Sequence, residues 1–334
     1  MKCFVTGASG FVGANLAHEL AAQGHSLRLL LRPGADLRGL ERIAYERIAG
    51  DLLDRAALEH GLRGCDWCFH VAACYALWLP DYRPLFAANV EGTRNVLEAA
   101  GGAGCSRIVY TSTVGCIGLP RAVGSSLTPS DETAQATRAQ MTNPYKESKW
   151  EAEAVAHDLA ARGLPIVIVN PTAPVGPRDV KPTPTGKVIV DFLNGRMPAY
   201  LDTGLNWVHV RDVARGHVLA AEMGRIGERY ILGHAAGNWT MKKALDTLAE
   251  ITGRPAPRWR IPYGLAAAFA HLDELKSRVT GSPPRAPLAA ALDATHHSSD
   301  YSTALSKASS LLDTPAQTPS ARVLAQMAAQ HGNS

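Results

Sequence analysis

A glycine-rich turn near the N-terminus constrains the fold of this chain more than any other segment. Residues 6–13, Thr-Gly-Ala-Ser-Gly-Phe-Val-Gly, follow an apolar strand at residues 2–6 and open an amphipathic helix at residues 12–23. Glycines at this spacing permit a tight turn, close approach of a pyrophosphate to the backbone, and close packing of the helix on the strand. The helix N-terminus adds N–H donors and a dipole that favours phosphate. The turn therefore predicts dinucleotide binding by Gly7, Ser9, Gly10, Phe11, Val12 and Gly13.

Strand-like and helix-like segments alternate through the first half of the chain. Further apolar strands are predicted at residues 26–31, 48–49, 67–71, 107–111 and 166–169. Further helices are predicted at residues 56–60, 84–100 and 145–161. Continuous apolar strands separated by helices are typical of a parallel sheet that is covered on both faces. The predicted fold class is therefore α/β, a Rossmann-type doubly wound parallel sheet with its ligand crevice at the carboxyl ends of the strands.

The pattern changes after residue 170. Five prolines between residues 171 and 184 are too dense for a helix. Strands are predicted beyond them at residues 207–210 and 229–232, and helices at residues 213–221, 241–251 and from about residue 320. We predict an NAD(P)-binding domain over residues 1–170. Residues 171–334 are predicted to form mainly a smaller, mixed substrate-binding lobe, with some segments returning to the first domain.

An apolar, helix-like segment at residues 263–270 allows two interpretations. The preferred one is packing in the core of the lobe. If part of the segment faces the crevice instead, the substrate is bulky and apolar, such as a sterol, a triterpenoid or an aromatic ketone.

Composition excludes several classes of protein. Of the 334 residues, 46% are apolar and 19% are charged, as in an ordinary globular protein. The net charge of +4 is slight, the basic residues are scattered and aromatic residues are sparse, which excludes a nucleic-acid partner. No apolar run reaches the roughly 20 residues that span a bilayer, and the strand-like start leaves no room for a signal peptide. We expect a cytoplasmic protein without stable membrane insertion that acts on a small molecule.

The six cysteines all lie within the first 116 residues. Cys65 and Cys68 have the spacing of a metal or redox pair, but no second pair or histidine cluster completes a zinc site. Their segment also leads into a buried strand, where cysteine is a small apolar residue. We expect reduced structural thiols and no metal.

Tyr145 and Lys149 form the strongest candidate pair for chemistry. Four residues apart in a predicted helix, they share one face about one turn from each other. A neighbouring ammonium favours the phenolate, which lowers the pKa of a tyrosine and lets it exchange a proton near neutral pH, as carbonyl/alcohol interconversion requires. Asn143 and Pro144 can cap and start the helix, which places the pair in a rigid first turn. The spacing alone also occurs on solvated helix faces, so the catalytic interpretation depends on the accompanying glycine-rich turn.

The end of the second predicted strand bears on which dinucleotide binds. An acidic side chain there would hydrogen-bond the ribose of NAD, whereas this chain carries Arg32. A guanidinium suits a 2′-phosphate, and Arg38 can add a second cation. Asp51 and Leu52, which close the short third strand, are expected to bracket the adenine. We favour NADP(H); NAD(H) is the alternative if Arg32 is only a solvated surface residue.

Together these motifs resemble the extended short-chain dehydrogenase/reductase superfamily, also called the NAD-dependent epimerase/dehydratase superfamily. Residues 6–13 resemble its TGxxGxxG turn, residues 145–149 its YxxxK pair, and residues 170–177 and 207–213 its C-terminal signatures. Asn89 resembles its structural asparagine before the central helix. The resemblance implies that Tyr145 exchanges the proton, Lys149 holds the nicotinamide ribose, and Thr113 hydrogen-bonds the reacting oxygen. Relatives commonly have serine at this third position, and Ser112 is the alternative if the register shifts by one.

Further contacts are expected around the crevice. Residues following the fourth and sixth strands are expected to line the cofactor: Val71, Ala72, Ala73, Pro171, Thr172 and Ala173. Tyr75 and Trp78 are expected at the crevice mouth, and Lys187 is a candidate for a substrate diphosphate. The superfamily's habit of pairing through two central helices implies a homodimer.

Within the superfamily, the chain resembles the dihydroflavonol-4-reductase-like branch, and more closely the hopanoid-associated sugar epimerase-type proteins, at residues 71–78, 181–187 and 195–200. The favoured function is an NADP(H)-dependent reductase or dehydrogenase for a bulky apolar substrate. One alternative is a nucleotide-sugar epimerase or dehydratase with bound NAD. Another is a 3β-hydroxysteroid dehydrogenase/decarboxylase-type enzyme. An intact set of Tyr145, Lys149 and Thr113 argues against a non-enzymatic cofactor sensor.

Overall fold

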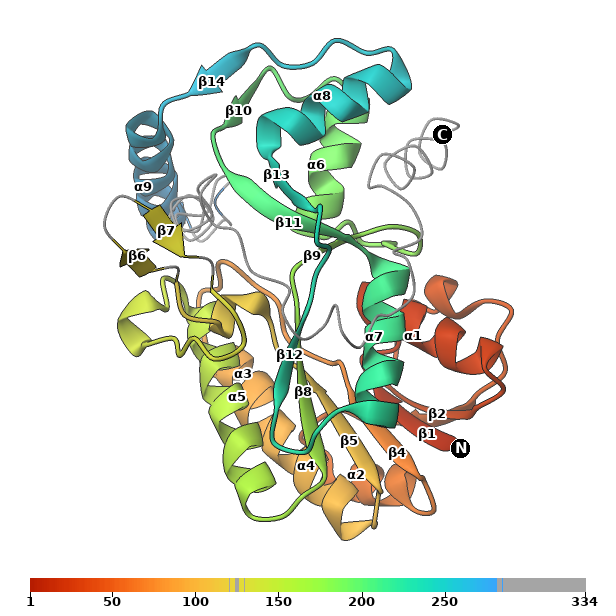
Figure 1. The fold of residues 1–334 in the computed structure, drawn as a ribbon. Helices are drawn as coiled ribbons and strands as arrows, with labels where there is room; N and C mark the ends of the chain where they lie inside the picture. Colours follow the sequence, from red (N-terminus) through yellow and green to blue (C-terminus); the bar gives the residue numbers. More distant parts are fainter. Residues whose placement is uncertain (120, 124–125, 129, 281–283, 285–334) are drawn as a thin grey trace.

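A seven-stranded parallel sheet forms the centre of this computed structural model, which describes residues 1–119, 121–123, 126–128, 130–280 and 284 (Figure 1). In spatial order the strands are β12 (Arg229–Leu232), β8 (Ile166–Pro171), β5 (Arg107–Thr111), β4 (Trp67–His70), β1 (Lys2–Thr6), β2 (Ser26–Leu31) and β3 (Glu46–Ala49). The order along the chain reverses between β1 and β4, and a sheet of this kind binds its ligand at that point. The predicted Rossmann-type fold class is confirmed.

Helices cover both faces of this sheet (Figure 1). α1 (Phe11–Ala22) and α7 (Val210–Met223) share one hydrophobic cluster with the strands, whereas α2 (Arg55–Leu62), α4 (Gly92–Gly102) and α5 (Pro144–Ala161) share the other. In β1, Phe4 belongs to the cluster of α2, α4 and α5, and Val5 belongs to the cluster of α1 and α7. Because successive strand side chains point to opposite faces, both must be apolar here. This explains the unbroken apolar runs in the sequence.

The helix predicted at residues 84–100 contains a wider turn. It consists of α3 (Arg83–Phe86), a π-helical segment η2 (Ala87–Glu91) and then α4. Asn89 lies in the π-helical segment, where it is buried. Such π turns are rare, and apolar periodicity does not reveal them. Short 3₁₀ segments occur at η1 (Arg38–Leu40), η3 (Val114–Cys116) and η4 (Arg138–Gln140).

The C-terminal lobe is built on smaller sheets. β9 (Ala173–Val175), β11 (Gly204–His209) and β13 (Asn238–Thr240) form one sheet, and β10 (Ala199–Leu201) pairs with β14 (Trp259–Ile261). α6 (Pro184–Leu193) and α8 (Met241–Thr252) pack against β9, β11 and β13 around Trp207 and Phe192. β6 (Arg121–Val123) pairs antiparallel with β7 (Ser126–Thr128), and α9 (Tyr263–Thr280) follows β14 along the chain. β12 lies along the chain among the segments of the C-terminal lobe, but it pairs with β8 in the large sheet.

α9 corrects one expectation from the sequence. The segment at residues 263–270 is helical, but its large side chains do not pack in the core of the lobe: Leu265 is 66% exposed and Phe269 is 56% exposed. The buried position of this segment is Ala270. Apolar periodicity predicted an apolar face and not the direction in which that face points. The helix predicted from residue 320 lies outside the described residues.

Candidate active site

The glycine-rich turn joins β1 to α1 and meets the segment that follows β4. Gly7 has a φ of +76°, and a Cβ at this position would lie 2.5 Å from the backbone nitrogen of Ala72. A Cβ on Gly13 would lie 2.2 Å from the carbonyl oxygen of Gly7. Gly10 caps α1 without a side-chain hydrogen bond, so no side chain of the cap covers the first N–H groups of the helix. No side chain of the cap residue occupies the N–H groups at the helix N-terminus, which fits a dinucleotide pyrophosphate.

The side chains predicted to select the cofactor lie after β2 and β3. Arg32 is exposed one residue past β2. Arg38 instead pairs with Asp36 through Nη2 and Oδ2 at 2.7 Å, and this contact lowers the pKa of Asp36 to about 2. Asp51 is also exposed, and its carboxylate accepts a hydrogen bond from the backbone N–H of Leu53 (2.8 Å). Arg32 forms no ion pair with any described residue, so it is the freer of the two predicted cations.

Leu52 and the residues after β8 complete the predicted cofactor set. Leu52 is half-buried, and its side chain fills the space that a Cβ on Gly92 would need. Pro171 ends β8, and Ala173 starts β9. Between them, the Thr172 hydroxyl donates to Asn206 Oδ1 (3.1 Å). The turn from the large sheet into the lobe is therefore fixed by a side chain of β11.

Tyr145 and Lys149 lie in the first part of α5. Asn143 caps this helix by accepting a hydrogen bond from the Lys146 N–H (2.9 Å), and Pro144 is its first residue. Lys149 is fully inside the protein: Nζ donates to the carbonyl oxygen of Thr111 at 2.8 Å. Burial lowers the pKa of Lys149 to about 8. The structure therefore brings a buried ammonium to the carboxyl end of β5, on the same helix as Tyr145.

Thr113 follows the end of β5. Its hydroxyl accepts a hydrogen bond from the Gly115 N–H (3.3 Å), and its carbonyl oxygen accepts one from Asn170 Nδ2 (2.9 Å). Thr113 is partly exposed, whereas Ser112 is buried. Of these two neighbouring hydroxyls, Thr113 is the more accessible to a ligand.

Tyr75 lies directly against Tyr145. The two ring centroids are 4.6 Å apart and the rings meet edge-on, at 65°. Asn89 holds the segment that carries Tyr75, because its amide accepts from the Cys74 N–H (2.7 Å) and donates to the Cys74 carbonyl oxygen (3.0 Å). The same amide donates to Ser148 Oγ (2.8 Å) on α5. One buried asparagine thus fixes the post-β4 segment against the helix of Tyr145.

Trp78 and Lys187 are the two other residues predicted to contact the substrate. Trp78 is partly buried in the segment after Tyr75. Lys187 extends from α6 in the lobe and pairs with Asp191 one turn later (Nζ–Oδ2, 2.5 Å). Neither residue has a contact in the structure that assigns it a role.

His70 is a buried polar residue that the sequence analysis did not single out. It ends β4, and its ring nitrogens lie 2.8 Å from Thr6 Oγ1 and 2.9 Å from Thr93 Oγ1. Burial, with a smaller contribution from the Lys149 charge, lowers the pKa of His70 to about 3. The ring is neutral at physiological pH and joins β1, β4 and α4 beneath the glycine-rich turn. The sequence feature that could have identified His70 is a histidine at the end of an apolar strand.

A buried charge pair supports the other side of the site. Arg229 Nη1 on β12 lies 2.7 Å from Glu153 Oε1 on α5, and both side chains are buried. Glu153 also accepts a hydrogen bond from Asn170 Nδ2 (2.8 Å), the amide that holds the Thr113 carbonyl. Glu153 lies four residues after Lys149, so its place on the buried face of the helix could be predicted from the sequence. Its partner was not, because 76 residues separate Glu153 from Arg229.

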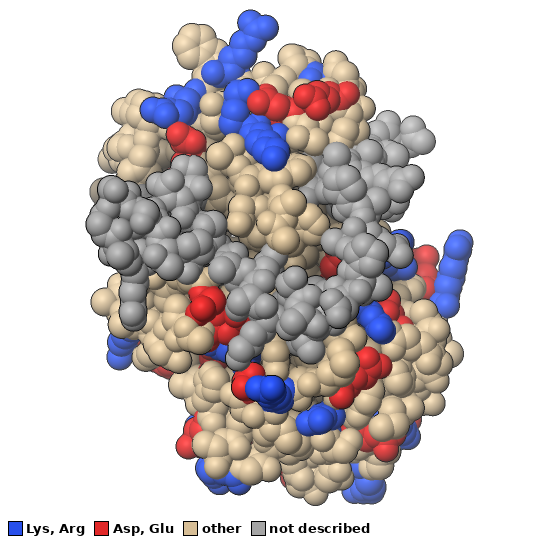
Figure 2. Space-filling model, viewed as in Figure 1, with Lys and Arg blue, Asp and Glu red and all other residues tan. Residues whose placement is uncertain are grey.

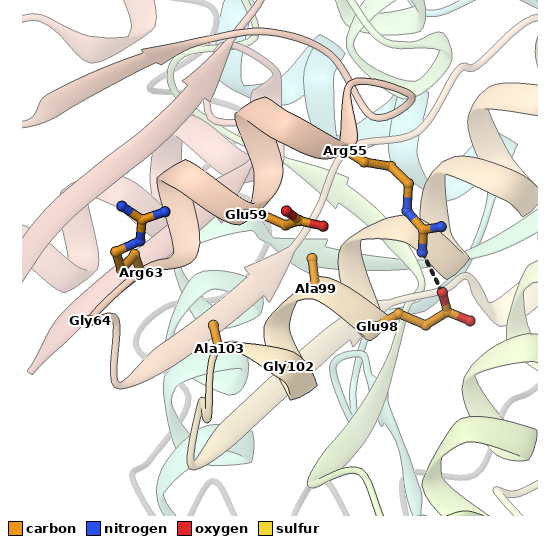
Figure 3. A pocket seen from close by; sticks show the side chains of 8 residues that line it. All are labelled: Arg55, Glu59, Arg63, Gly64, Glu98, Ala99, Gly102 and Ala103. Atoms are coloured by element: carbon orange, nitrogen blue, oxygen red, sulfur yellow. Dashed lines mark hydrogen bonds and ion pairs between the residues drawn. The ribbon is translucent and has the colours of Figure 1, made fainter.

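A groove of about 580 Å³ between α2 and α4 lies elsewhere (Figure 3). It is lined by Arg55, Glu59, Arg63, Gly64, Glu98, Ala99, Gly102 and Ala103. Arg55 reaches from α2 to pair with Glu98 on α4 (Nη2–Oε2, 2.6 Å). The lining residues at the ends of both helices lead into the amino ends of β4 and β5. The groove therefore extends toward the edge of the sheet opposite Tyr145.

Comparison with known proteins places this geometry in a family. Residues 3–233 match the model of the NAD dependent epimerase/dehydratase family. A putative dihydroflavonol 4-reductase of Synechocystis sp. is 44% identical over 289 residues, 85% of this chain and 82% of the relative. Sterol demethylase protein B of Methylococcus capsulatus is 37% identical over 283 residues, 83% of each chain.

A solved structure agrees with these sequence relatives. The crystal structure of gox2253 is 41% identical and has a TM-score of 0.84 over 99% of this chain and 98% of that one. The glycine-rich turn and the helix of Tyr145 and Lys149 both lie within the matched segment, at the carboxyl edge of the same sheet. The chain therefore belongs to the NAD-dependent epimerase/dehydratase family, the extended short-chain dehydrogenase/reductases, and is an NAD(P)-dependent oxidoreductase.

Proposed function

We propose that this protein uses NADP(H) to interconvert a carbonyl and a secondary alcohol on a bulky, apolar substrate. The contact between Tyr145 and Tyr75 carries the proposal. The two rings meet 4.6 Å apart, and half of the Tyr75 side chain is exposed. An aromatic wall beside the proton-exchanging phenol favours a planar or polycyclic ketone. A sugar is disfavoured there, because its hydroxyls need hydrogen-bonding partners.

The chain's own residues divide the work of the reaction. When bound, the nicotinamide supplies or accepts the hydride at the substrate carbon. In the reducing direction, Tyr145 donates its proton to the carbonyl oxygen while Thr113 hydrogen-bonds the same oxygen, and a secondary alcohol results. Lys149 stabilises the phenolate left on Tyr145 until solvent returns the proton. In the oxidising direction the same groups act in reverse.

The cofactor is held by the turn and by two cations. The N–H groups at the start of α1 bind the pyrophosphate, and Arg32 binds the 2′-phosphate. Lys149 reaches the nicotinamide ribose. Asp51 and Leu52 border the adenine. Val71, Ala72 and Ala73 after β4, and Pro171, Thr172 and Ala173 at the end of β8 and start of β9, would line the cofactor.

The names of the relatives support the substrate class. One is named for a dihydroflavonol and another for a sterol, and both molecules are polycyclic and carry an oxygenated ring. A flat ring system of this kind can pack against Tyr75 and Trp78 at the crevice mouth. We therefore propose a sterol, triterpenoid or aromatic ketone, or the corresponding alcohol, as the substrate class.

The Arg32 side chain gives a direct test of the cofactor preference. We expect Arg32→Ala to weaken NADPH binding by about tenfold to a hundredfold, because it removes a charge-assisted contact to the 2′-phosphate. NADH has no such phosphate and should bind the variant as it binds the unaltered protein. Fluorescence titration with both nucleotides measures this. Arg47→Ala is the matched control, since Arg47 is an exposed arginine within β3. Equal loss of both nucleotides, or no change in either, would contradict the role of Arg32.

A substrate screen tests the reaction. Purified protein with NADPH or NADP⁺ is given sterol and triterpenoid ketones and alcohols, aromatic ketones, carboxylated sterols and UDP-sugars. We expect turnover in the apolar group, and Tyr145→Phe should lower kcat by about 10²- to 10⁴-fold because it removes the proton donor. Turnover of UDP-sugars alone would replace this proposal with an epimerase. Release of CO₂ from a carboxylated sterol would identify a decarboxylating dehydrogenase.

A further inference from the structure

Large apolar side chains on α9 point outward. Four of them are each between 56% and 67% exposed: Leu265, Phe269, Leu272 and Leu275. They recur at intervals of three and four residues, so they share one face of the helix. Among the positions of this helix whose burial the structure describes, the buried ones carry small side chains, Ala270 and Ser277. This arrangement is the reverse of that in an ordinary surface helix, and a contiguous exposed apolar surface marks an interaction site. We call these four residues the α9 stripe.

β14, which precedes α9, adds an aromatic residue between two cations. Trp259 is 77% exposed, and its neighbours Arg258 and Arg260 are exposed as well. Arg260 pairs with Asp202 at the surface (Nη1–Oδ2, 3.0 Å), whereas Arg258 has no ion pair among the described residues. Lys276 adds an exposed cation near the other end of α9. Figure 2 shows Lys and Arg side chains, with Asp and Glu side chains among them, over the end of the lobe that carries β14.

This combination fits the boundary between lipid headgroups and acyl chains. Aliphatic side chains enter that boundary, tryptophan prefers it, and lysine and arginine contact anionic headgroups. A protein partner would ordinarily make about one hydrogen bond per 100–200 Å² of interface, and the side chains of the α9 stripe offer none. No helix among the described residues is long and apolar enough to cross a bilayer, so the contact belongs at its surface.

We propose that β14 and α9 form a docking surface for an anionic lipid bilayer. The α9 stripe and Trp259 enter the acyl boundary, and Arg258, Arg260 and Lys276 face the phosphate headgroups. Docking brings the C-terminal lobe to apolar molecules dissolved in the bilayer. The inference goes beyond the proposed reaction, and binding is measured without cofactor or substrate. Its failure therefore leaves the proposed reaction standing.

Vesicle co-sedimentation of the full-length chain tests this surface. One set of vesicles contains phosphatidylcholine alone, and the other contains phosphatidylcholine with an equal amount of phosphatidylglycerol. We expect the protein to sediment with the anionic vesicles and to be released by salt. Phe269→Ser with Leu272→Ser should lower partitioning by about tenfold or more. Arg258→Gln should lower it about fivefold on the anionic vesicles.

Matched control variants distinguish a specific loss of vesicle binding from an effect that any surface substitution would have. Ile226→Ser replaces an exposed apolar residue in the turn between α7 and β12, and Arg162→Gln replaces an exposed arginine at the end of α5. Both should bind vesicles like the unaltered protein. Circular dichroism and NADPH binding confirm that every variant is folded.

Several outcomes would overturn the proposal. One is failure of the unaltered protein to bind anionic vesicles. Another is vesicle binding that survives Phe269→Ser with Leu272→Ser. If these two substitutions instead reduce the assembly size in light scattering, and no vesicles are bound, the stripe is an interface between copies of the chain.

Discussion

Burial of the Lys149 ammonium makes this residue a source of instability in the folded protein. Its pKa in the folded protein is about 8 against an ordinary value of 10.5 because the side chain is buried, so the unfolded chain holds the proton more tightly. Below pH 8 this difference favours unfolding, and it disappears as the pH rises from 8 to 10.5. The ammonium is therefore a cost to the fold at neutral pH that a catalytic role would explain.

Replacement of this lysine by an apolar side chain of similar length tests the point. We expect Lys149→Met to raise the free energy of unfolding at pH 7 by as much as about 3 kcal/mol, because a charge no longer has to be buried. Oxidoreductase activity should fall to background. Urea unfolding and activity assays measure the two effects. Lys242→Met, at a half-exposed position on α8 where the lysine pairs with Asp246, should change neither stability nor turnover greatly. A less stable Lys149→Met protein would mean that the hydrogen bond to Thr111 outweighs the cost of burial.

At the scale of elements, α5 is held against β12 and β8 by polar groups inside an apolar layer. Glu153 on α5 receives hydrogen bonds from Arg229 and Asn170, and Arg229 also donates to the carbonyl oxygens of Glu132 (2.8 Å) and Ala134 (2.6 Å). Through Asn170, this network reaches the backbone of Thr113. Helix, sheet and the Thr113 turn thus share one set of charge-assisted contacts.

Breaking this ion pair from one side should be more harmful than removing both charges. We expect Arg229→Met to cost about 3–5 kcal/mol of unfolding free energy, because Glu153 is left charged and buried. Adding Glu153→Leu should return part of that loss, with a coupling energy of about 0.5–3 kcal/mol between the two sites. Chemical unfolding of both single variants and the double variant gives the coupling. Additive losses would mean that Arg229 acts mainly through the carbonyl oxygens.

The elements also differ in how much of their structure the sequence predicts. The turn at residues 6–13 and the capped start of α5 depend on neighbouring residues, so spacing alone predicted them. The contact between Tyr75 and Tyr145 joins segments 70 residues apart and depends on Asn89, whose position in a π-helical turn leaves no mark in the periodicity. α9 shows a further limit. Its apolar spacing predicts a helix, but only the packed structure shows that the large residues face outward.

For the whole molecule, buried neutral histidines couple the fold to pH. His70 links β1, β4 and α4, and His217 on α7 reaches Thr111 on β5 through Nε2 (2.9 Å) and donates from Nδ1 to the Val213 carbonyl oxygen (2.7 Å). Burial lowers the pKa of His70 to about 3 and that of His217 to about 4. His70 lies on the face of the sheet that α4 covers and His217 on the face that α7 covers, so protonation of the two rings would disturb the packing of both faces.

The direction of the pH effect follows from these shifts. As pH falls below 6.5, the histidines of the unfolded chain take up protons while the folded chain keeps His70 and His217 neutral, so stability is lost toward pH 4. Between pH 7 and pH 5 the two rings together should lower the free energy of unfolding by about 4 kcal/mol. His217→Gln keeps a donor and an acceptor but cannot be protonated; it should be less stable at pH 7 and lose about 2 kcal/mol less than the unaltered protein on acidification. His60→Gln, at an exposed position on α2, should retain the full pH dependence. Urea unfolding of the three proteins at both pH values decides the matter, and an unchanged slope in His217→Gln would assign the acid sensitivity to other groups.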